Sequence, residues 1–390
     1  MLQGFFRTIL LCLGLFLFGY TFIVSGIIIN LLQCCSLVIW PFHKNLYRRI
    51  NCTLANQHWS PEVVYLAEWF SGTDCIVYSD AALFDRHLGR ESNLVILNHK
   101  HDIDWLLGWI VCQRYNVLGS SKVFAKNELR YVPFIGWSWV LLEMVFLKRD
   151  WTRDKPYLIK CLKILAEYPV HCWILLFCEG TRFTEEKKVK SNEIARQKGL
   201  PELKHHLLPR TKGFVVVMEA FKGKVPAIYD CTLGCSQEYA QPTLYNIVMG
   251  KKCLGHMLVR RIPINDISTA SEEECAMECH KIYQYKDKAY EYFQKYQTFE
   301  GFDGGKYHGR KIPRTIKTLM IEIFWNIILC VPSFYYLGRL LINGPIWYSI
   351  TLVVVIVLAI LLIRAMIHVT DTKRGSKYGA VQNGEQKKQN

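Results

Sequence analysis

Two histidines and two carboxylates lie in the octapeptide of residues 98–105, NHKHDIDW. An imidazole takes up a proton near neutral pH, and a carboxylate bonded to its second ring nitrogen orients the ring and stabilises its charged form. His99 and Asp104, with four residues between them, can meet in this way across a turn. The spacing also permits His101 to pair with Asp102 or with Asp104. The octapeptide is therefore a candidate acid–base site whose pairing the spacing leaves open.

The alternation of His99 and His101 is also typical of the start of a metallo-hydrolase motif. Such a motif continues with Asp and then His at the next two ligand positions, where this chain has Ile103 and Asp104. Two of its four ligands do not match, so we predict no metal at this segment.

The second candidate is the tetrapeptide Glu179, Gly180, Thr181 and Arg182, which follows the apolar run of residues 173–177. A glycine-containing turn at a strand end exposes backbone N–H groups, and an arginine beside it offers a two-pronged donor. Both suit a phosphate. Taken alone the pattern is weak, because many surface turns hold a Glu and an Arg.

The third candidate is the stretch of residues 126–149, in which bases alternate with aromatic residues such as Trp137 and Trp139. This pattern suits a groove for an acidic headgroup or a pantetheine chain, although the tryptophans would equally serve as anchors at a membrane interface. Pro226, in the run 225–228, is predicted to shape a pocket wall or to mark an edge strand.

Short apolar runs alternate with helical patterns between residues 61 and 304. The octapeptide lies between a strand-like run and a helix-like one, and such turns line the carboxyl edge of α/β sheets, where ligands bind. We predict an α/β domain with a central sheet flanked by helices. The predicted strands are residues 94–97, 173–177, 214–218, 225–228 and 257–259, and the predicted helices include 156–168 and 272–294.

The composition indicates a membrane surface as the partner of the basic charge. A net charge of +15 accompanies 51% hydrophobic residues, and we find no nucleic-acid-binding motif. The 15 cysteines are scattered and odd in number, which favours reduced thiols. A zinc site made by Cys231, Cys235, Cys275 and Cys279 is disfavoured, because the spacing within each pair is three residues rather than two.

Residues 9–40 are apolar over more than the roughly 20 residues needed to cross a bilayer. They are too long for the core of a signal peptide, so we predict an anchor, either one tilted helix or a re-entrant pair. Bases cluster directly after this stretch, at Lys44, Arg48 and Arg49, against Arg7 before it. This bias predicts that the following domain faces the cytosol.

Two further apolar stretches, residues 321–342 and 346–367, are joined by Asn343, Gly344 and Pro345. They predict a transmembrane hairpin with both flanks in the cytosol, because basic residues lie outside each end. The chain ends KKQN, which resembles a dilysine endoplasmic reticulum signal. The predicted organisation is an anchor at 1–45, a cytosolic catalytic domain at 46–305, a basic segment and hairpin at 306–369, and a disordered tail at 370–390.

Taken in chain order, the four blocks resemble the four motifs of the glycerolipid acyltransferase family. These blocks are Asn98 and His99 with Asp104, then 126–149, then 179–182, and then Pro226. Further stretches, such as 118–122 and 207–214, are similar to animal 1-acylglycerol-3-phosphate acyltransferases of the gamma and delta types. The similarity covers residues 1 to about 300.

This resemblance implies roles for individual residues. His99 would be the general base and Asp104 its orienting partner, whereas His101 and Asp102 fall in the variable interior of the motif and should be dispensable for proton transfer. Substrate-binding positions would be Lys126, Gly136, Arg149, Glu179, Gly180, Thr181, Arg182 and Pro226. The second motif ends with Lys148 and Arg149, which departs from the family pattern and leaves open which base meets phosphate.

The resemblance also implies a reaction. A fatty acyl chain would pass from acyl-CoA, as co-substrate, directly to the sn-2 hydroxyl of 1-acylglycerol-3-phosphate, giving phosphatidic acid with no bound cofactor. The enzyme would be a multi-pass protein of the endoplasmic reticulum membrane with its catalytic domain and C-terminus in the cytosol. The alternatives are another lyso-acceptor, such as lysophosphatidylinositol, or a membrane-shaping protein without turnover.

Overall fold

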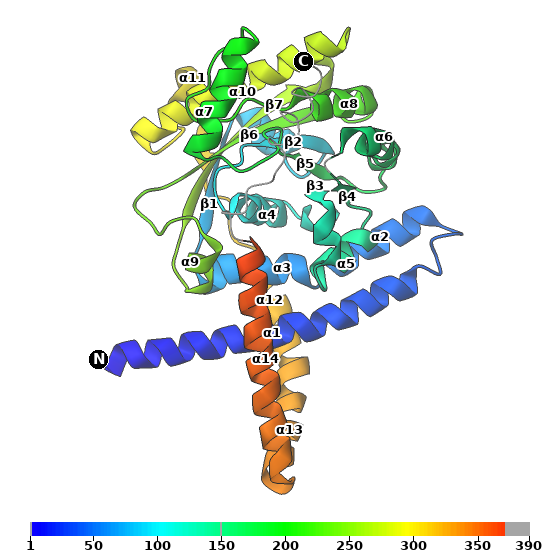
Figure 1. Ribbon diagram of the computed structural model, residues 1–390, viewed down its shortest axis with the longest axis vertical. Coiled ribbons are helices and arrows are strands. Elements are labelled where there is room, and N and C mark those ends of the chain that lie inside the picture. Colours follow the sequence, from blue (N-terminus) through cyan, green and yellow to red (C-terminus); the bar gives the residue numbers. More distant parts are fainter. Residues whose placement is uncertain (1, 149, 371–390) are drawn as a thin grey trace, which may run out of the picture. The chain divides into compact units, whose positions relative to one another are not determined.

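The computed structural model describes residues 2–148 and 150–370. The chain forms two compact units, Met1–Ile327 and Ile328–Asn390. The first contains a mixed sheet with helices on both faces (Figure 1). The predicted α/β class with a central, helix-flanked sheet is therefore confirmed for this unit.

Within the described residues the sheet has eight strands in the order β4-β3-β5-β2-β6-β7-β1-β8. Their bounds are β1 Asp74–Ser79, β2 Asn93–Leu97, β3 Lys122–Lys126, β4 Val145–Leu147, β5 Trp173–Leu176, β6 Ala227–Cys235, β7 Leu254–Pro263 and β8 His308–Arg310. Strands β4, β3, β5, β2 and β6 run parallel to one another, whereas β7 is antiparallel to β6. The carboxyl ends of the parallel strands therefore share one edge of the sheet.

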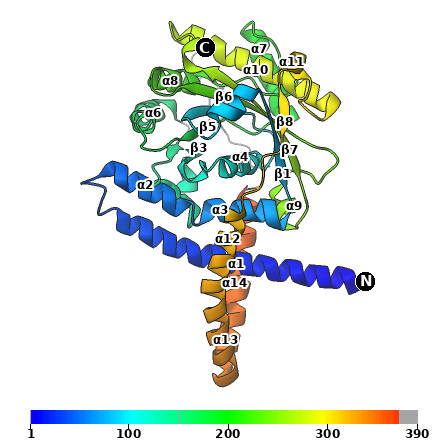
Figure 2. The ribbon, with the colours of Figure 1, turned by 180° about the vertical axis from the view of Figure 1, so that it is seen from behind.

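The helices of the first unit lie on both faces of the sheet (Figures 1 and 2). They are α1 Leu2–Ser36, α2 Lys44–Ala55, α3 Trp59–Tyr65, α4 Asp104–Arg114, α5 Ile135–Leu141, α6 Trp151–Ala166, α7 Glu185–Gln197, α8 Thr211–Phe221, α9 Leu244–Val248, α10 Glu272–Tyr296, α11 Phe302–Gly305 and α12 Ile316–Trp325. The second unit contains α13 Val331–Asn343 and α14 Ile346–Thr370.

Strand β2 shows how the two faces are filled. Its side chains alternate, as the pleat of a strand requires. Val95 and Leu97 pack on the side of α4, whereas Leu94 and Ile96 pack on the side of α6, α8 and α10. An apolar run without polar alternation is typical of such a strand, which is buried on both faces.

The prediction of a strand at residues 214–218 is wrong. These residues lie in helix α8, where Phe214, Val217 and Phe221 are buried with 0% exposure. Their spacing of three and four residues fits one helical face, but a short apolar run cannot by itself separate a buried helix from a buried strand. The predictions for β2, β5 and β7 name the right segments, and helices α6 and α10 are likewise confirmed. The strand predicted at 225–228 overlaps β6 only at its first two residues.

Helix α1 is a single uninterrupted helix, not a re-entrant pair. One of its sides carries polar residues that bond to the domain: Ser25 donates to Glu62 on α3 at 2.9 Å, and Ser36 accepts from Asn51 on α2 at 2.9 Å. Leu13, Leu31 and other large apolar side chains are exposed elsewhere on this helix. The polar contacts attach α1 to the domain and leave large apolar side chains exposed on the rest of the helix.

The second unit is a helical hairpin. Helices α13 and α14 run side by side in both views (Figures 1 and 2), and the chain reverses at Gly344 and Pro345, which confirms the predicted turn. Among the described residues, Ile9–Ser36 and Ile316–Asn343 are long and apolar enough to cross a bilayer by length and composition. The KKQN ending lies outside the described residues.

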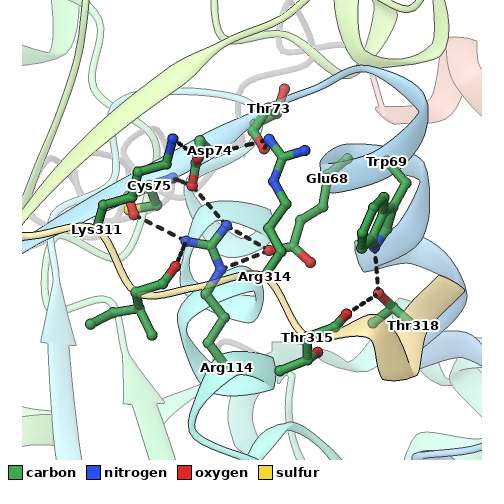
Figure 3. A network of polar contacts seen from close by, with 12 residues as sticks. Glu68, Trp69, Thr73, Asp74, Cys75, Arg114, Lys311, Arg314, Thr315 and Thr318 are labelled. Carbon is green, nitrogen blue, oxygen red and sulfur yellow. Dashed lines mark hydrogen bonds and ion pairs between the residues drawn. The ribbon is translucent and has the colours of Figure 1, made fainter.

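Part of the basic segment belongs to the sheet domain. Strand β8 pairs antiparallel with β1, and Arg314 donates to the carbonyl oxygens of Gly72 and Thr73 at 3.0 and 3.1 Å. Lys311 lies 3.2 Å from a carboxylate oxygen of Asp74 (Figure 3). These bases therefore attach the segment before α12 to the domain.

Candidate active site

His99 and Asp104 form a side-chain pair. Nδ1 of His99 lies 3.1 Å from Oδ2 of Asp104, and the histidine side chain is 21% exposed while the carboxylate is fully buried. The ring of His99 stacks on Phe177 with centroids 4.3 Å apart. With Nδ1 donating to the carboxylate, Nε2 is the nitrogen that can accept a proton.

Asp104 also organises the backbone of the turn. Its Oδ2 accepts hydrogen bonds from the backbone amides of Lys100 at 2.6 Å and His101 at 2.8 Å. The carboxylate is the first residue of α4, so it benefits from the positive end of the helix dipole. Asp104 is thus held in place by three donors, and it holds His99 in turn.

His101 and Asp102 take other positions. His101 is largely buried, and burial lowers the pKa of its imidazole. Asp102 is paired with Arg182 instead of a histidine. The structure therefore resolves the pairing that the spacing left open, in favour of His99 with Asp104.

Glu179 points into the domain rather than toward solvent. Its Oε1 accepts the amide of His99 at 2.9 Å, and its Oε2 accepts the amide of Leu207 at 3.2 Å. Burial raises the pKa of this carboxyl to about 8, although the two amide donors oppose the rise. These contacts make Glu179 a clamp between two loops, whereas its predicted contact with substrate stays a prediction.

In the turn after β5, Gly180 is exposed, whereas Thr181 and Arg182 are half-buried. Gly180 has a φ of +67°, a conformation that favours glycine. Arg182 bonds to Asp102, while its Nε is buried without a hydrogen-bond partner among the described residues. Lys187, on α7, donates from Nζ to the hydroxyl of Thr181 and to the carbonyl of Arg182, both at 2.9 Å.

The β2 and β5 turns meet at one edge of the sheet. The amide of Phe183 donates to the carbonyl of His99 at 2.8 Å. Lys126 is exposed at the end of β3, which is parallel to β5, so it lies at the same edge. This edge therefore collects His99, Arg182 and Lys126, as sequence analysis predicted for ligand-binding loops.

Other predicted positions do not join them. Pro226 precedes β6, whose first residue pairs with Asn93 at the start of β2, so it lies at the opposite edge. Gly136 is buried, and a Cβ there would lie 2.2 Å from the carbonyl oxygen of Leu129, which gives this glycine a packing role. Arg149 lies outside the described residues. No group of three or more potential metal ligands occurs among the described residues.

Three site-supporting residues escaped sequence analysis. Lys286, on α10, is fully buried and donates to the carbonyls of Ile96 and Cys231 at 2.8 and 2.7 Å. Its neighbour Asp287 accepts the amides of Lys204 and His205, both at 2.8 Å. Lys187 is the third. Nothing in their local sequence separates them from the other charged residues of two polar helices.

An apolar cavity of about 50 Å³ lies between the sheet and α4. Its lining includes Leu97 on β2, Gly108 on α4 and five tryptophans, which are Trp59, Trp105, Trp109, Trp139 and Trp173. A Cβ on Gly108 would meet no atom within 4 Å, so the helix leaves room there. The cavity therefore lies beneath β2, the strand that precedes the His99 turn, and most of its lining is apolar.

Two family models match this chain. One, described as Acyltransferase, covers residues 84–236, and it includes both the His99 turn and the Arg182 turn. The other, described as Acyltransferase C-terminus, covers residues 246–325, and it includes α10 with Lys286 and Asp287. The fold and the site thus define an acyltransferase.

Named relatives narrow the class. The chain is 46% identical over 363 residues to mouse 1-acyl-sn-glycerol-3-phosphate acyltransferase gamma, covering 93% of this chain and 94% of the relative. It is 44% identical to the human gamma protein, with the same coverage, and 43% identical to the bovine delta protein, with 93% of each chain covered. The chain therefore belongs to the 1-acyl-sn-glycerol-3-phosphate acyltransferase family.

Proposed function

We propose that this protein transfers an acyl group from acyl-CoA to the sn-2 hydroxyl of 1-acylglycerol-3-phosphate, giving phosphatidic acid. The observation that carries the proposal is the His99–Asp104 pair beside the Arg182 turn, at one sheet edge, in a chain of this family. A base next to an anion-binding turn suits an acceptor that carries both a hydroxyl and a phosphate.

The reaction is a direct transfer. Nε2 of His99 takes the proton of the sn-2 hydroxyl while the oxygen attacks the thioester carbonyl. The carbon–sulfur bond then breaks, and the departing thiolate receives the proton from His99. Asp104 keeps the N–H on Nδ1 and stabilises the imidazolium between these steps.

Binding supplies orientation. Arg182 and Lys126 would hold the acceptor phosphate at the sheet edge, which converts an encounter of two substrates into a reaction within one complex. Asp102 is paired with Arg182. When the phosphate binds, Arg182 would either contact both anions or break its pair with Asp102.

The apolar cavity under β2 is the proposed position of an acyl chain. Its tryptophan-rich lining and the open space at Gly108 support this assignment. The chain would leave water as it enters, gaining about 0.8 kcal/mol for each buried methylene group.

The membrane arrangement is part of the proposal. The apolar surface of α1 and the hairpin α13–α14 would anchor the protein in the endoplasmic reticulum membrane, with the catalytic domain and C-terminus in the cytosol. The basic residues on both sides of the hairpin support this orientation.

The test is the His99→Ala variant. General-base catalysis contributes about 10² to 10⁴ in rate, so acyl transfer from oleoyl-CoA to lysophosphatidic acid should fall at least about 10²-fold. His308→Ala, which removes a 65% exposed histidine, is the matched control and should retain full activity. Residual activity of His99→Ala within about tenfold of the wild type would refute the assignment.

Two rival functions are separated by the same assay. A panel of lyso-acceptors that includes lysophosphatidylinositol distinguishes the acceptor. Release of CoA thiol by the purified protein distinguishes turnover from a membrane-shaping role, and its absence with every acceptor would favour the latter.

A further inference from the structure

We propose that Arg210 is a second phosphate-binding residue of the turn after β5, acting beside Arg182. The inference rests on the proposed function, because the phosphate belongs to one of the two proposed substrates. Arg210 lies far from this turn in sequence and belongs to none of the four motif blocks.

The position of the Arg210 side chain carries the inference. It lies across Gly180: a Cβ placed on that glycine would be 2.9 Å from Cδ and 3.1 Å from Nε of Arg210. The missing side chain of Gly180 therefore makes room for the guanidinium stem. Arg210 is an exposed residue, so a substrate in solution can reach it.

The backbone of Arg210 is held against the same turn. Its amide donates to the carbonyl of Cys178 at 2.7 Å, and the amide of Leu207 donates to Glu179 at 3.2 Å. The segment carrying Arg210 thus moves with the β5 turn. Glu179 also holds the amide of His99, so the general base and Arg210 are tied to one carboxylate.

A second clamp comes from α10. Asp287 accepts from the amides of Lys204 and His205, and its Oδ1 lies 3.0 Å from Nδ1 of His206. Three contacts to one carboxylate fix the start of the segment that ends at Arg210. A preformed arginine loses less side-chain freedom on binding an anion than a mobile one does.

The chemistry of the turn calls for more than one cation. Arg182 shares its guanidinium with Asp102, and Lys187 donates to Thr181 and to the Arg182 carbonyl. A phosphomonoester carries close to two negative charges at neutral pH. Arg210 supplies a further guanidinium, whose planar fork matches phosphate oxygens.

Two phosphates can be the partner: the headgroup of lysophosphatidic acid or the phosphates of coenzyme A. The experiment measures KM for each substrate separately with Arg210→Gln. We expect one KM to rise about tenfold or more, as for the loss of a charge-assisted hydrogen bond, with kcat within about threefold. A rise for lysophosphatidic acid assigns the acceptor headgroup, and a rise for oleoyl-CoA assigns the coenzyme.

Two further variants complete the design. Arg210→Lys keeps the charge but loses the fork, so its KM should lie between those of the wild type and Arg210→Gln. Lys224→Gln removes another exposed cation, one beyond the far end of α8 and paired with Glu167, and should change neither KM. The inference is overturned if Arg210→Gln, with an unchanged melting temperature, leaves both KM values within twofold or lowers only kcat.

A binding measurement separates this inference from the proposed function. If the wild type transfers no acyl group to lysophosphatidic acid, the proposed function fails. Calorimetric titration of wild type and Arg210→Gln with coenzyme A and with lysophosphatidic acid then decides the role of Arg210. Weaker binding of either ligand by the variant supports it, whereas equal binding or no binding by the wild type overturns it.

Discussion

Helix α4 has a polar cluster at each end, and the two clusters differ in how completely their charges are satisfied. At its first residue, Asp104 holds a histidine that is 21% exposed, next to the partly exposed pair of Asp102 and Arg182. At its last residue, Arg114 is fully buried and paired with Glu68 and Asp74. About 15 Å separates these ends.

The Arg114 cluster uses nearly every donor of the guanidinium (Figure 3). Nε and Nη2 bond to Glu68 and Asp74 at 2.7 Å, and Nη1 bonds to the carbonyl of Ile312 at 2.9 Å. Burial raises the pKa of the Glu68 carboxyl. Burial acts in the same direction on Asp74, but Arg114, the Cys75 amide and Lys311 together lower the pKa of that carboxyl. Among its buried side-chain atoms within the described residues, Oε2 of Glu68 lacks a hydrogen-bond partner.

The comparison teaches that a structural charge cluster differs from a reactive one in how many of its charged atoms have hydrogen-bond or ion-pair partners within the chain. Burying charges costs several kcal/mol per ion unless partners surround them. The Arg114 cluster meets most of that requirement within the chain, whereas the His99 end keeps a histidine that a substrate can reach. Changes at one end should therefore affect stability, and changes at the other should affect rate.

The largest effect is expected for Arg114→Met. The change leaves Glu68 and Asp74 with fewer partners in a buried site, so the free energy of unfolding should fall by about 3–5 kcal/mol. Chemical denaturation in detergent measures it. Arg196→Met, which breaks an exposed ion pair with Glu202, should change stability by less than about 1 kcal/mol. If both variants lost the same free energy of unfolding, the buried and exposed ion pairs would not differ in their contribution to stability.

Asp104→Asn should act on rate. Asparagine can still accept one of the turn amides but carries no charge to stabilise an imidazolium, so kcat should fall by about 10² to 10³. Steady-state assays at saturating substrate, together with a melting curve, measure both consequences. If Asp104→Asn had a much lower melting temperature but an unchanged kcat per folded molecule, Asp104 would have a structural role like that of the Arg114 cluster.

Gly108→Leu probes the middle of the same helix. The new side chain would enter the apolar cavity, where a Cβ meets nothing within 4 Å, and leucine favours helix more than glycine does. We expect a preference shifted at least about threefold toward shorter acyl-CoA chains, measured by competition between lauroyl-CoA and oleoyl-CoA. An unchanged ratio would argue that the cavity holds no acyl chain.

The smallest effect is expected for Asp102→Asn. Its carboxylate and Arg182 are both partly exposed, and exposed pairs contribute about 1 kcal/mol or less. Activity should stay within about fivefold of the wild type, with any change appearing in KM for the acceptor. A loss of kcat approaching that of Asp104→Asn would show that proton transfer uses Asp102 and would reopen the pairing.

Residue spacing and apolar patterning predicted four of the eight strands described in the sheet, β2, β5, β6 and β7, and missed β1, β3, β4 and β8. The runs at β2 and β5 and the long amphipathic pattern of α10 are local signals, because they depend on periodicity within one segment. The turn Asn343–Pro345 is another. The pattern failed at residues 214–218, because an apolar run of five residues is too short to separate a buried helix from a buried strand.

Sequence by itself determined the candidate chemical groups, since the types and order of His99, Asp104 and Arg182 are local facts. The family resemblance already implied Asp104 as the partner of His99, and the structure shows their contact. Only the tertiary structure decided that Pro226 lies at the opposite sheet edge and that Lys286 and Asp287 support the site. The reason is physical: these contacts join residues up to 190 positions apart. Strand order and helix packing bring them together, and no local pattern records either.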